Sequence, residues 1–169
     1  KWLGFDATNF NTIKEVIDIA ITSPPYLNAF DYTQIIKIES AWVGTLENED
    51  IIKLRSVQVG NEKRRDNEID SFIETLFKPF YEELINQGEK ENKNYTNIAK
   101  TCLSYFNDIR SNLMCVKDVL KKGGEYHMII GDNTIKKVEI PTHKLTEKKK
   151  KKIGFEWFGY YKYAIKDHR

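Results

Sequence analysis

The chain contains little cysteine and little proline, and neither sign of charge is in strong excess. It has 2 cysteines, 4 prolines and a net charge of +2 in 169 residues. Cys102 and Cys115 do not stand at metal-ligand spacing with a histidine, so we expect reduced, buried thiols and no metal site. The small positive charge is compatible with nucleic-acid binding but does not argue for it.

Long apolar runs are also absent. No segment approaches the roughly 20 apolar residues that cross a bilayer. The first residues include Asp6 and other polar side chains where a signal peptide would need an apolar stretch. We therefore expect no membrane association and a cytoplasmic location. With 40% hydrophobic residues, the chain can supply the core of one domain over residues 1–169.

Hydrophobic periodicity predicts alternating helices and buried strands, which is typical of an α/β fold with a parallel sheet flanked by helices. Strands are expected at residues 1–5, 17–22, 125–130 and 156–166. Helices are expected at residues 31–46, 69–86, 96–121 and 142–152. Gly123-Gly124 should stop the third helix, and residues 88–94 should form a polar break. Residues 47–65 are polar and charged.

The most informative motif is Ser23-Pro24-Pro25-Tyr26, which directly follows a predicted strand. Proline fixes φ near about −65° and restricts the residue before it, so the chain should leave the strand as a stiff corner. The hydroxyl of Ser23 and the carbonyl of Pro24 are hydrogen-bond acceptors, and two acceptors on a nucleobase amine would free its conjugated lone pair. The Tyr26 ring offers a face on which the base can stack.

A simpler interpretation is that Pro-Pro only ends the strand and that Tyr26 packs on the core. The motif stands at the carboxyl end of its strand, where ligands bind in open α/β sheets. This position favours a functional corner.

Longer segments around this motif carry a family resemblance. DIAITSPPYLNAFDYTQIIKIESAWVG resembles the catalytic motif and following helix of the amino-directed DNA methyltransferases, which methylate cytosine N4 or adenine N6 with S-adenosylmethionine. VLKKGGEYHMIIGDN is similar to their next helix, Gly-Gly turn and strand, and the segment from Val138 to Arg169 to the helix and strand after that. The resemblance implies a partial Rossmann-like methyltransferase fold.

The same resemblance implies roles for individual residues. Ser23 and Pro24 would hold the target amine, with Pro25 shaping the corner and Tyr26 stacking on a base that has left the duplex. Leu3-Gly4-Phe5-Asp6-Ala7 is similar to the end of the third strand, whose Asp contacts the cofactor adenine in relatives. The implied cofactor-binding residues are Phe5, Asp6, Ala7 and Thr22.

Further residues are candidates for contact with double-stranded DNA. Asp31 and Tyr32 follow the corner closely enough to line the same pocket, although Asp31 would also serve as a helix N-cap. Lys63, Arg64 and Arg65 lie in an expected, mostly helical insertion at about residues 47–94, and either contact phosphate or form an ordinary charged loop. The lysine run at residues 148–152 points all round a helix, which favours a solvated surface.

Two side chains near the predicted strand at residues 125–130 have simpler interpretations. Asp132 lines the site mouth or, in the favoured interpretation, caps the following turn. His127 is a core or flanking residue of the strand.

Departures from the family pattern shape the functional prediction. No Gly-rich cofactor turn is present, and the chain begins at what resembles the third strand, so we expect an interior piece that acts with the remaining part of the methyltransferase. Neither cysteine follows a proline, which excludes cytosine-C5 chemistry. In the family that the chain resembles, Ser at the first motif position is commoner in cytosine-N4 enzymes, so the resemblance favours cytosine N4 over adenine N6. A non-catalytic, DNA-binding remnant or partner subunit, and a methyltransferase acting on RNA or a protein amide, remain alternatives.

Overall fold

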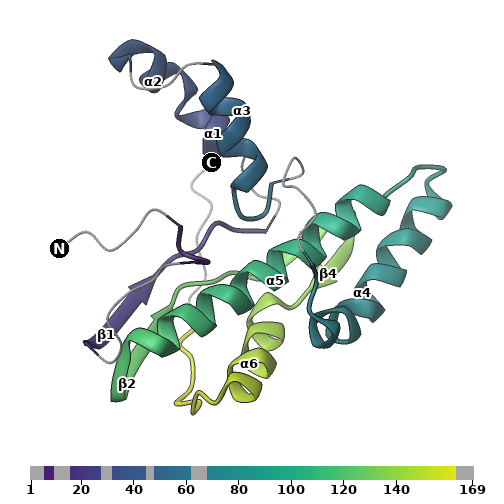
Figure 1. The fold of residues 1–169 in the computed structure, drawn as a ribbon. Helices are drawn as coiled ribbons and strands as arrows, with labels where there is room; N and C mark the ends of the chain where they lie inside the picture. The colour runs from purple at the N-terminus through teal and green to yellow at the C-terminus, as the bar shows by residue number, and fades with distance from the viewer. Residues whose placement is uncertain (1–5, 10–15, 28–31, 45–47, 62–67, 163–169) are drawn as a thin grey trace.

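The computed structural model describes residues 6–9, 16–27, 32–44, 48–61 and 68–162. These residues form a mixed α/β structure with a two-stranded parallel sheet flanked by helices (Figure 1). The elements in chain order are β1 (Ile17–Thr22), α1 (Tyr32–Ile35), α2 (Lys37–Val43), α3 (Asn48–Val57), α4 (Ser71–Lys90), α5 (Thr96–Val119), β2 (Leu120–Met128), β3 (Asn133–Ile135), β4 (Val138–Ile140) and α6 (Thr142–Ile153).

The parallel sheet consists of β1 and β2. The bounds predicted for β1 are confirmed. Ala20 lies opposite Tyr126 on the face that packs toward α5, whereas Ile19 and Ile21 point to the other face and are 57% and 73% exposed. Alternation along the strand therefore gives the sheet one covered face and one exposed face.

The expected role of Gly123-Gly124 as a helix stop is wrong. Helix α5 ends at Val119, and β2 begins at Leu120, so both glycines lie inside the strand. Gly123 has a φ of +80°, and a Cβ on Gly124 would lie 3.1 Å from the carbonyl oxygens of Ile17 and Asp18. The register also shifts here, because Ile17 pairs with Leu120 but Ile19 with Glu125. The glycines form an irregularity at the start of the sheet, where a side chain would separate the strands.

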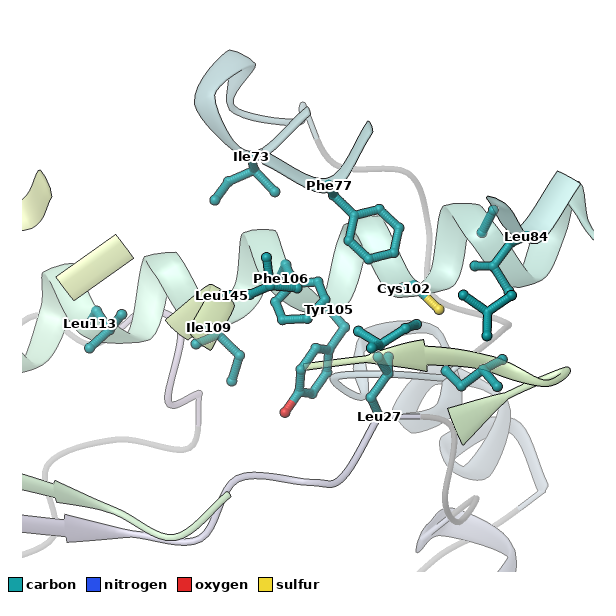
Figure 2. Close-up of a cluster of buried hydrophobic side chains, with 14 residues drawn as sticks. Leu27, Ile73, Phe77, Leu84, Cys102, Tyr105, Phe106, Ile109, Leu113 and Leu145 are labelled. Carbon is teal, nitrogen blue, oxygen red and sulfur yellow. The ribbon is translucent and has the colours of Figure 1, made fainter. Parts of the chain in front are cut away.

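The core lies around α5, which agrees with its predicted apolar stripe. Figure 2 shows side chains of α4, α5 and α6 meeting there, with Leu27 joining from the segment after β1. Phe77 of α4 stacks at a tilt on Phe106 of α5 with ring centroids 5.3 Å apart. The central buried residues are Leu27, Ile73, Phe77, Leu84, Ala99, Cys102, Tyr105, Phe106, Ile109, Leu113, Ile135, Val138, Ile140 and Leu145.

Helix α4 runs further than predicted, through part of the expected polar break to Lys90. Gly88 lies within the helix. Its position leaves no room for a side chain, because a Cβ there would come 2.5 Å from the Lys93 carbonyl oxygen and 3.3 Å from the Tyr95 ring. Asp70 caps the N-terminus, accepting a hydrogen bond from the backbone N–H of Phe72 at 3.0 Å. Gly88 thus permits a close approach of the next segment and does not end the helix.

The region from Asn133 to Ile140 is an antiparallel hairpin, which was not predicted from the sequence. Val138–Ile140 is strand β4, not the start of a helix as the resemblance implied. Helix α6 follows close to its predicted bounds. The strand expected at residues 156–166 is wrong for residues 156–162, which have no strand assignment, while 163–166 lie outside the described residues.

Helices α1, α2 and α3 form an arm that stands apart from α4, α5 and α6 (Figure 1). The single helix predicted for residues 31–46 is interrupted at Ile36, and α2 ends at Val43, where Gly44 forms the C-cap with a φ of +67°. Its apolar stripe is exposed, with Ile38 at 70% and Trp42 at 90%. Helices α3 and α4 fall within the expected insertion at about residues 47–94, although its status as an insertion stays a prediction. Of the described helices, none is both long and apolar enough to cross a membrane.

Candidate functional site

The Ser-Pro-Pro-Tyr corner begins where β1 ends. The carbonyl of Thr22, the last strand residue, accepts a hydrogen bond from the backbone N–H of Ile129 at 2.9 Å. Because β1 and β2 are parallel, both strands end at this edge of the sheet. The corner therefore projects from the carboxyl edge, as predicted, and the chain just before it is fixed to the neighbouring strand.

Exposure changes steadily along the corner. Ser23 is exposed, Pro24 and Tyr26 are half-buried, and Leu27 is 1% exposed within the core. Neither the Ser23 hydroxyl nor the Pro24 carbonyl makes a hydrogen bond with another described residue. Both acceptors are therefore free to receive donors from a ligand, while Leu27 ties the corner to the interior.

Asp6, the candidate for contact with the cofactor, lies in a short exposed turn. Its Oδ1 accepts hydrogen bonds from the backbone N–H of Thr8 at 2.8 Å and from the Thr8 hydroxyl at 2.7 Å. No other described residue bonds the second oxygen, Oδ2. The next residue, Ala7, is exposed, and Phe5 lies outside the described residues.

A hydrogen-bond relay docks this turn on α5 and β2. The amide of Asn112 donates to the Ala7 carbonyl at 2.7 Å, and the Tyr126 hydroxyl donates to Asn112 Oδ1 at 2.5 Å. Burial raises the pKa of Tyr126 above its ordinary value, so this phenol stays a donor at neutral pH. Within the described ranges, no hydrogen bond joins the turn to the corner. Among the described residues of this turn, Asp6 Oδ2 is thus the one group that is placed to accept a hydrogen bond from an adenosyl cofactor.

Of the candidate DNA-contacting residues, only Tyr32 is described. It is the first residue of α1 and is half-buried. The pKa of Tyr105, on α5, is raised by burial and further by its proximity to the phenols of Tyr32 and Tyr26. Tyr26 and Tyr32 are therefore both close enough to Tyr105 to influence its ionisation. Asp31, Lys63, Arg64 and Arg65 lie outside the described residues.

The structure adds two neighbours of the corner that were not predicted from the sequence. Tyr105 is 1% exposed beside Leu27, and Gly60 packs against the Tyr105 ring from the end of α3. Tyr105 has a sequence signal, because it stands three residues after Cys102 and four before Ile109 on the apolar face of α5. The Gly60-Asn61 pair indicates a turn, but nothing in the sequence indicates that this turn packs against Tyr105.

Two titratable pairs near the sheet have structural roles. Asp132 accepts hydrogen bonds from the backbone N–H of His143 at 3.2 Å and from its Nδ1 at 2.6 Å, so it caps the first turn of α6. Partial burial alone would raise the pKa of Asp132, but the two bonds from His143 hold it below its ordinary value. His127 flanks the sheet and pairs with Glu125 at 2.8 Å on the exposed face.

Other chemistry finds less support in the part of the chain that is described. There, no group of three or more His, Cys, Asp or Glu residues is placed to hold a metal ion. Burial raises the pKa of Cys102 to about 12, so its thiol is not a nucleophile. A small void bounded by Ile73, Phe77 and Leu145 lies within the core and has no polar group to orient a ligand.

Comparisons with models of known families, with curated proteins and with solved structures find no match. The corner and its surroundings are therefore interpreted from their own geometry.

Proposed function

We propose that this chain provides the amine-binding part of a DNA methyltransferase that acts on cytosine N4, within a Rossmann-like architecture. The observation that carries the proposal is the corner at the carboxyl edge of a parallel sheet, with two free acceptors and a half-buried aromatic ring. The resemblance of the surrounding segments to amino-directed DNA methyltransferases supports the same reaction.

The corner would act by placement. The Ser23 hydroxyl and the Pro24 carbonyl each accept a hydrogen bond from one N–H of the amine. These bonds draw the nitrogen toward tetrahedral geometry while Tyr26 stacks on the flipped base. S-adenosylmethionine, when bound, supplies a methyl group activated on a sulfonium, and Asp6 Oδ2 would hold its adenine. The corner would hold the amine nitrogen in line with that methyl group, and the methylated amine would release one proton to solvent.

Several partners follow from the proposal. The substrate is double-stranded DNA with a flipped base, and the remaining part of the methyltransferase would contribute most of the cofactor site. Because the described residues assemble only a small part of that site, the chain would depend on this second part for activity.

The test is substitution of Ser23 by Ala in the intact protein within its own host. An amine that gains positive charge makes hydrogen bonds worth about 1.5–3 kcal/mol, so losing one acceptor should slow transfer roughly 10- to 150-fold. Mass spectrometry of nucleosides from host DNA should show less N4-methylcytosine. Ser71→Ala removes an exposed serine from the first turn of α4 and should leave methylation unchanged.

The same measurement separates the alternatives. A loss of N6-methyladenine in place of N4-methylcytosine would reassign the target to adenine. Host DNA in which neither modified base depends on Ser23 would contradict the enzyme assignment and favour a non-catalytic DNA-binding remnant. Titration of the intact protein with S-adenosylmethionine distinguishes a remnant, which should not bind it.

A further inference from the structure

A turn at the end of α3 brings the helical arm back to the corner. Gln58 is the first residue after α3, and its side-chain oxygen accepts hydrogen bonds from the Thr33 hydroxyl at 2.6 Å and from the Thr33 backbone N–H at 3.3 Å. Thr33 is buried near the start of α1. These bonds close the base of the arm, because they join the start of its first helix to the end of its third.

Gly60 is the point at which this turn meets the corner. It has a φ of +76°, and a Cβ there would lie 3.3 Å from Cδ2 of the Tyr105 ring and 3.9 Å from the backbone oxygen of Tyr26. The first distance is tighter than an ordinary contact, and the Tyr105 ring is packed in the core and cannot retreat. The absence of a side chain at Gly60 thus lets the turn lie against both tyrosines.

The ring of Tyr105 packs against Gly60, where the turn comes close to the Tyr26 backbone. Figure 2 shows the Tyr105 ring pointing away from Ile73 and Phe77, toward the side from which Leu27 enters. Its pKa is raised mainly by burial, then by the nearby phenols of Tyr32 and Tyr26. One buried ring therefore contacts the arm and lies beside the chain segment that carries the Ser-Pro-Pro-Tyr corner.

We propose that the Gln58–Gly60 turn is a positioning element that sets the placement of Tyr26, so that the geometry of the corner depends on the base of the arm, where the end of α3 is bonded to the start of α1. The consequence for catalysis rests on the proposed function, because Tyr26 is there the stacking platform for the base. The placement itself does not rest on it. A displaced Tyr26 would misalign the base relative to the two acceptors and slow transfer more than it weakens DNA binding.

The arm supplies a matched control. Gly44 also has a left-handed φ, +67°, but a Cβ there would find nothing within 4 Å. Gly60→Ala and Gly44→Ala therefore impose similar backbone strain, and only Gly60→Ala also presses on the Tyr105 ring, next to the Tyr26 backbone. A difference between the two variants in the measurements below is therefore caused by the contact of the Gly60 Cβ with Tyr105 and not by backbone strain.

The first readout is the backbone amide chemical shifts of Tyr26 and Leu27 in the intact, ¹⁵N-labelled protein. Gly60→Ala should move both resonances, whereas Gly44→Ala should leave them in place. Equal shifts in the two variants would overturn the proposal. If Gly60→Ala does not fold, Gln58→Ala removes the bonds to Thr33 without adding an atom, and unmoved Tyr26 and Leu27 resonances in that variant would equally overturn it.

The second readout is methyl transfer to DNA. Gly60→Ala should lower kcat about tenfold or more, with a smaller change in KM, since a misplacement of about 1 Å can cost two orders of magnitude. Gly44→Ala should keep the wild-type kcat. Moved resonances in a protein whose wild type transfers no methyl group would support the positioning element and contradict the proposed function.

Discussion

Leu27 holds the corner to the core, so truncating it tests the fold around the candidate site. Its side chain is 1% exposed in the same buried cluster as Phe77 and Tyr105. Leu27→Ala removes three buried carbons, and at about 0.8 kcal/mol each the transfer cost alone is roughly 2.4 kcal/mol. The cavity left behind adds to this cost, and fully buried Leu→Ala substitutions span about 2.7–5 kcal/mol. We expect a loss of about 3–4 kcal/mol in the free energy of unfolding.

Urea unfolding followed by circular dichroism measures this loss. In a chain of this length, the thermal midpoint should fall by about 6–16 °C. Leu54→Ala is the matched control, because Leu54 lies on α3 and is 39% exposed, and it should cost about 1 kcal/mol or less. Leu27→Met keeps the volume and should cost less than about 1.5 kcal/mol. If Leu27→Ala were as mild as Leu54→Ala, the corner could not be anchored in the core as described.

Two further predictions concern the rest of the fold. Hydrogen bonds from Lys137, Tyr95 and Gln87 lower the pKa of Glu91 from 4.5 to about 2, so its stabilising contribution is present above pH 4.5 and is lost as the pH falls toward 2. The urea midpoint of wild type should therefore exceed that of Glu91→Gln at pH 7 and converge with it at low pH; a constant difference would refute this. Gly124→Ala should lower the thermal midpoint through its contacts with strand carbonyls, and an unchanged midpoint would show that the strands separate freely.

Prediction from sequence succeeded where a signal is local and periodic. β1 was predicted with its observed bounds, and α5 nearly so, because each has a clear apolar pattern. The bounds of α6 were also predicted closely, although this helix has no apolar repeat. It failed where a glycine makes room for another segment. Gly88 and Gly124 look like breaks in the sequence, but Gly88 admits the carbonyl of Lys93 in the following turn, and Gly124 admits carbonyls of the neighbouring strand.

The hairpin escaped prediction for a different reason. Its turn is Lys136-Lys137, with φ values of +49° and +68°. Both central residues of such a tight turn need positive φ, for which Asn-Gly is the usual signal and Lys-Lys is not. The tertiary contacts of Val138 and Ile140 in the core overrode the local preference.

For the candidate site, the sequence predicted the position of the corner but not its supports. The strand end and the two prolines are encoded within a few residues, so their geometry follows locally. Tyr105 and Gly60 reach the corner from distant parts of the chain, and no short-range pattern connects them to Tyr26. Long-range packing of this kind becomes visible only when the helices are placed around the core.

The corner is a stronger candidate for chemistry than the two titratable pairs near the sheet. Glu125–His127 lies on the exposed face of β2, away from the corner's covered side, and Asp132–His143 is occupied in capping α6. The corner has fixed points on both sides, since the Thr22 carbonyl is bonded to β2 and Leu27 is buried. Between them, two prolines remove most of the remaining backbone freedom. Two acceptors that have no partner among the described residues and are held this firmly suit a reaction that depends on placement and not on proton transfer by an acid or base.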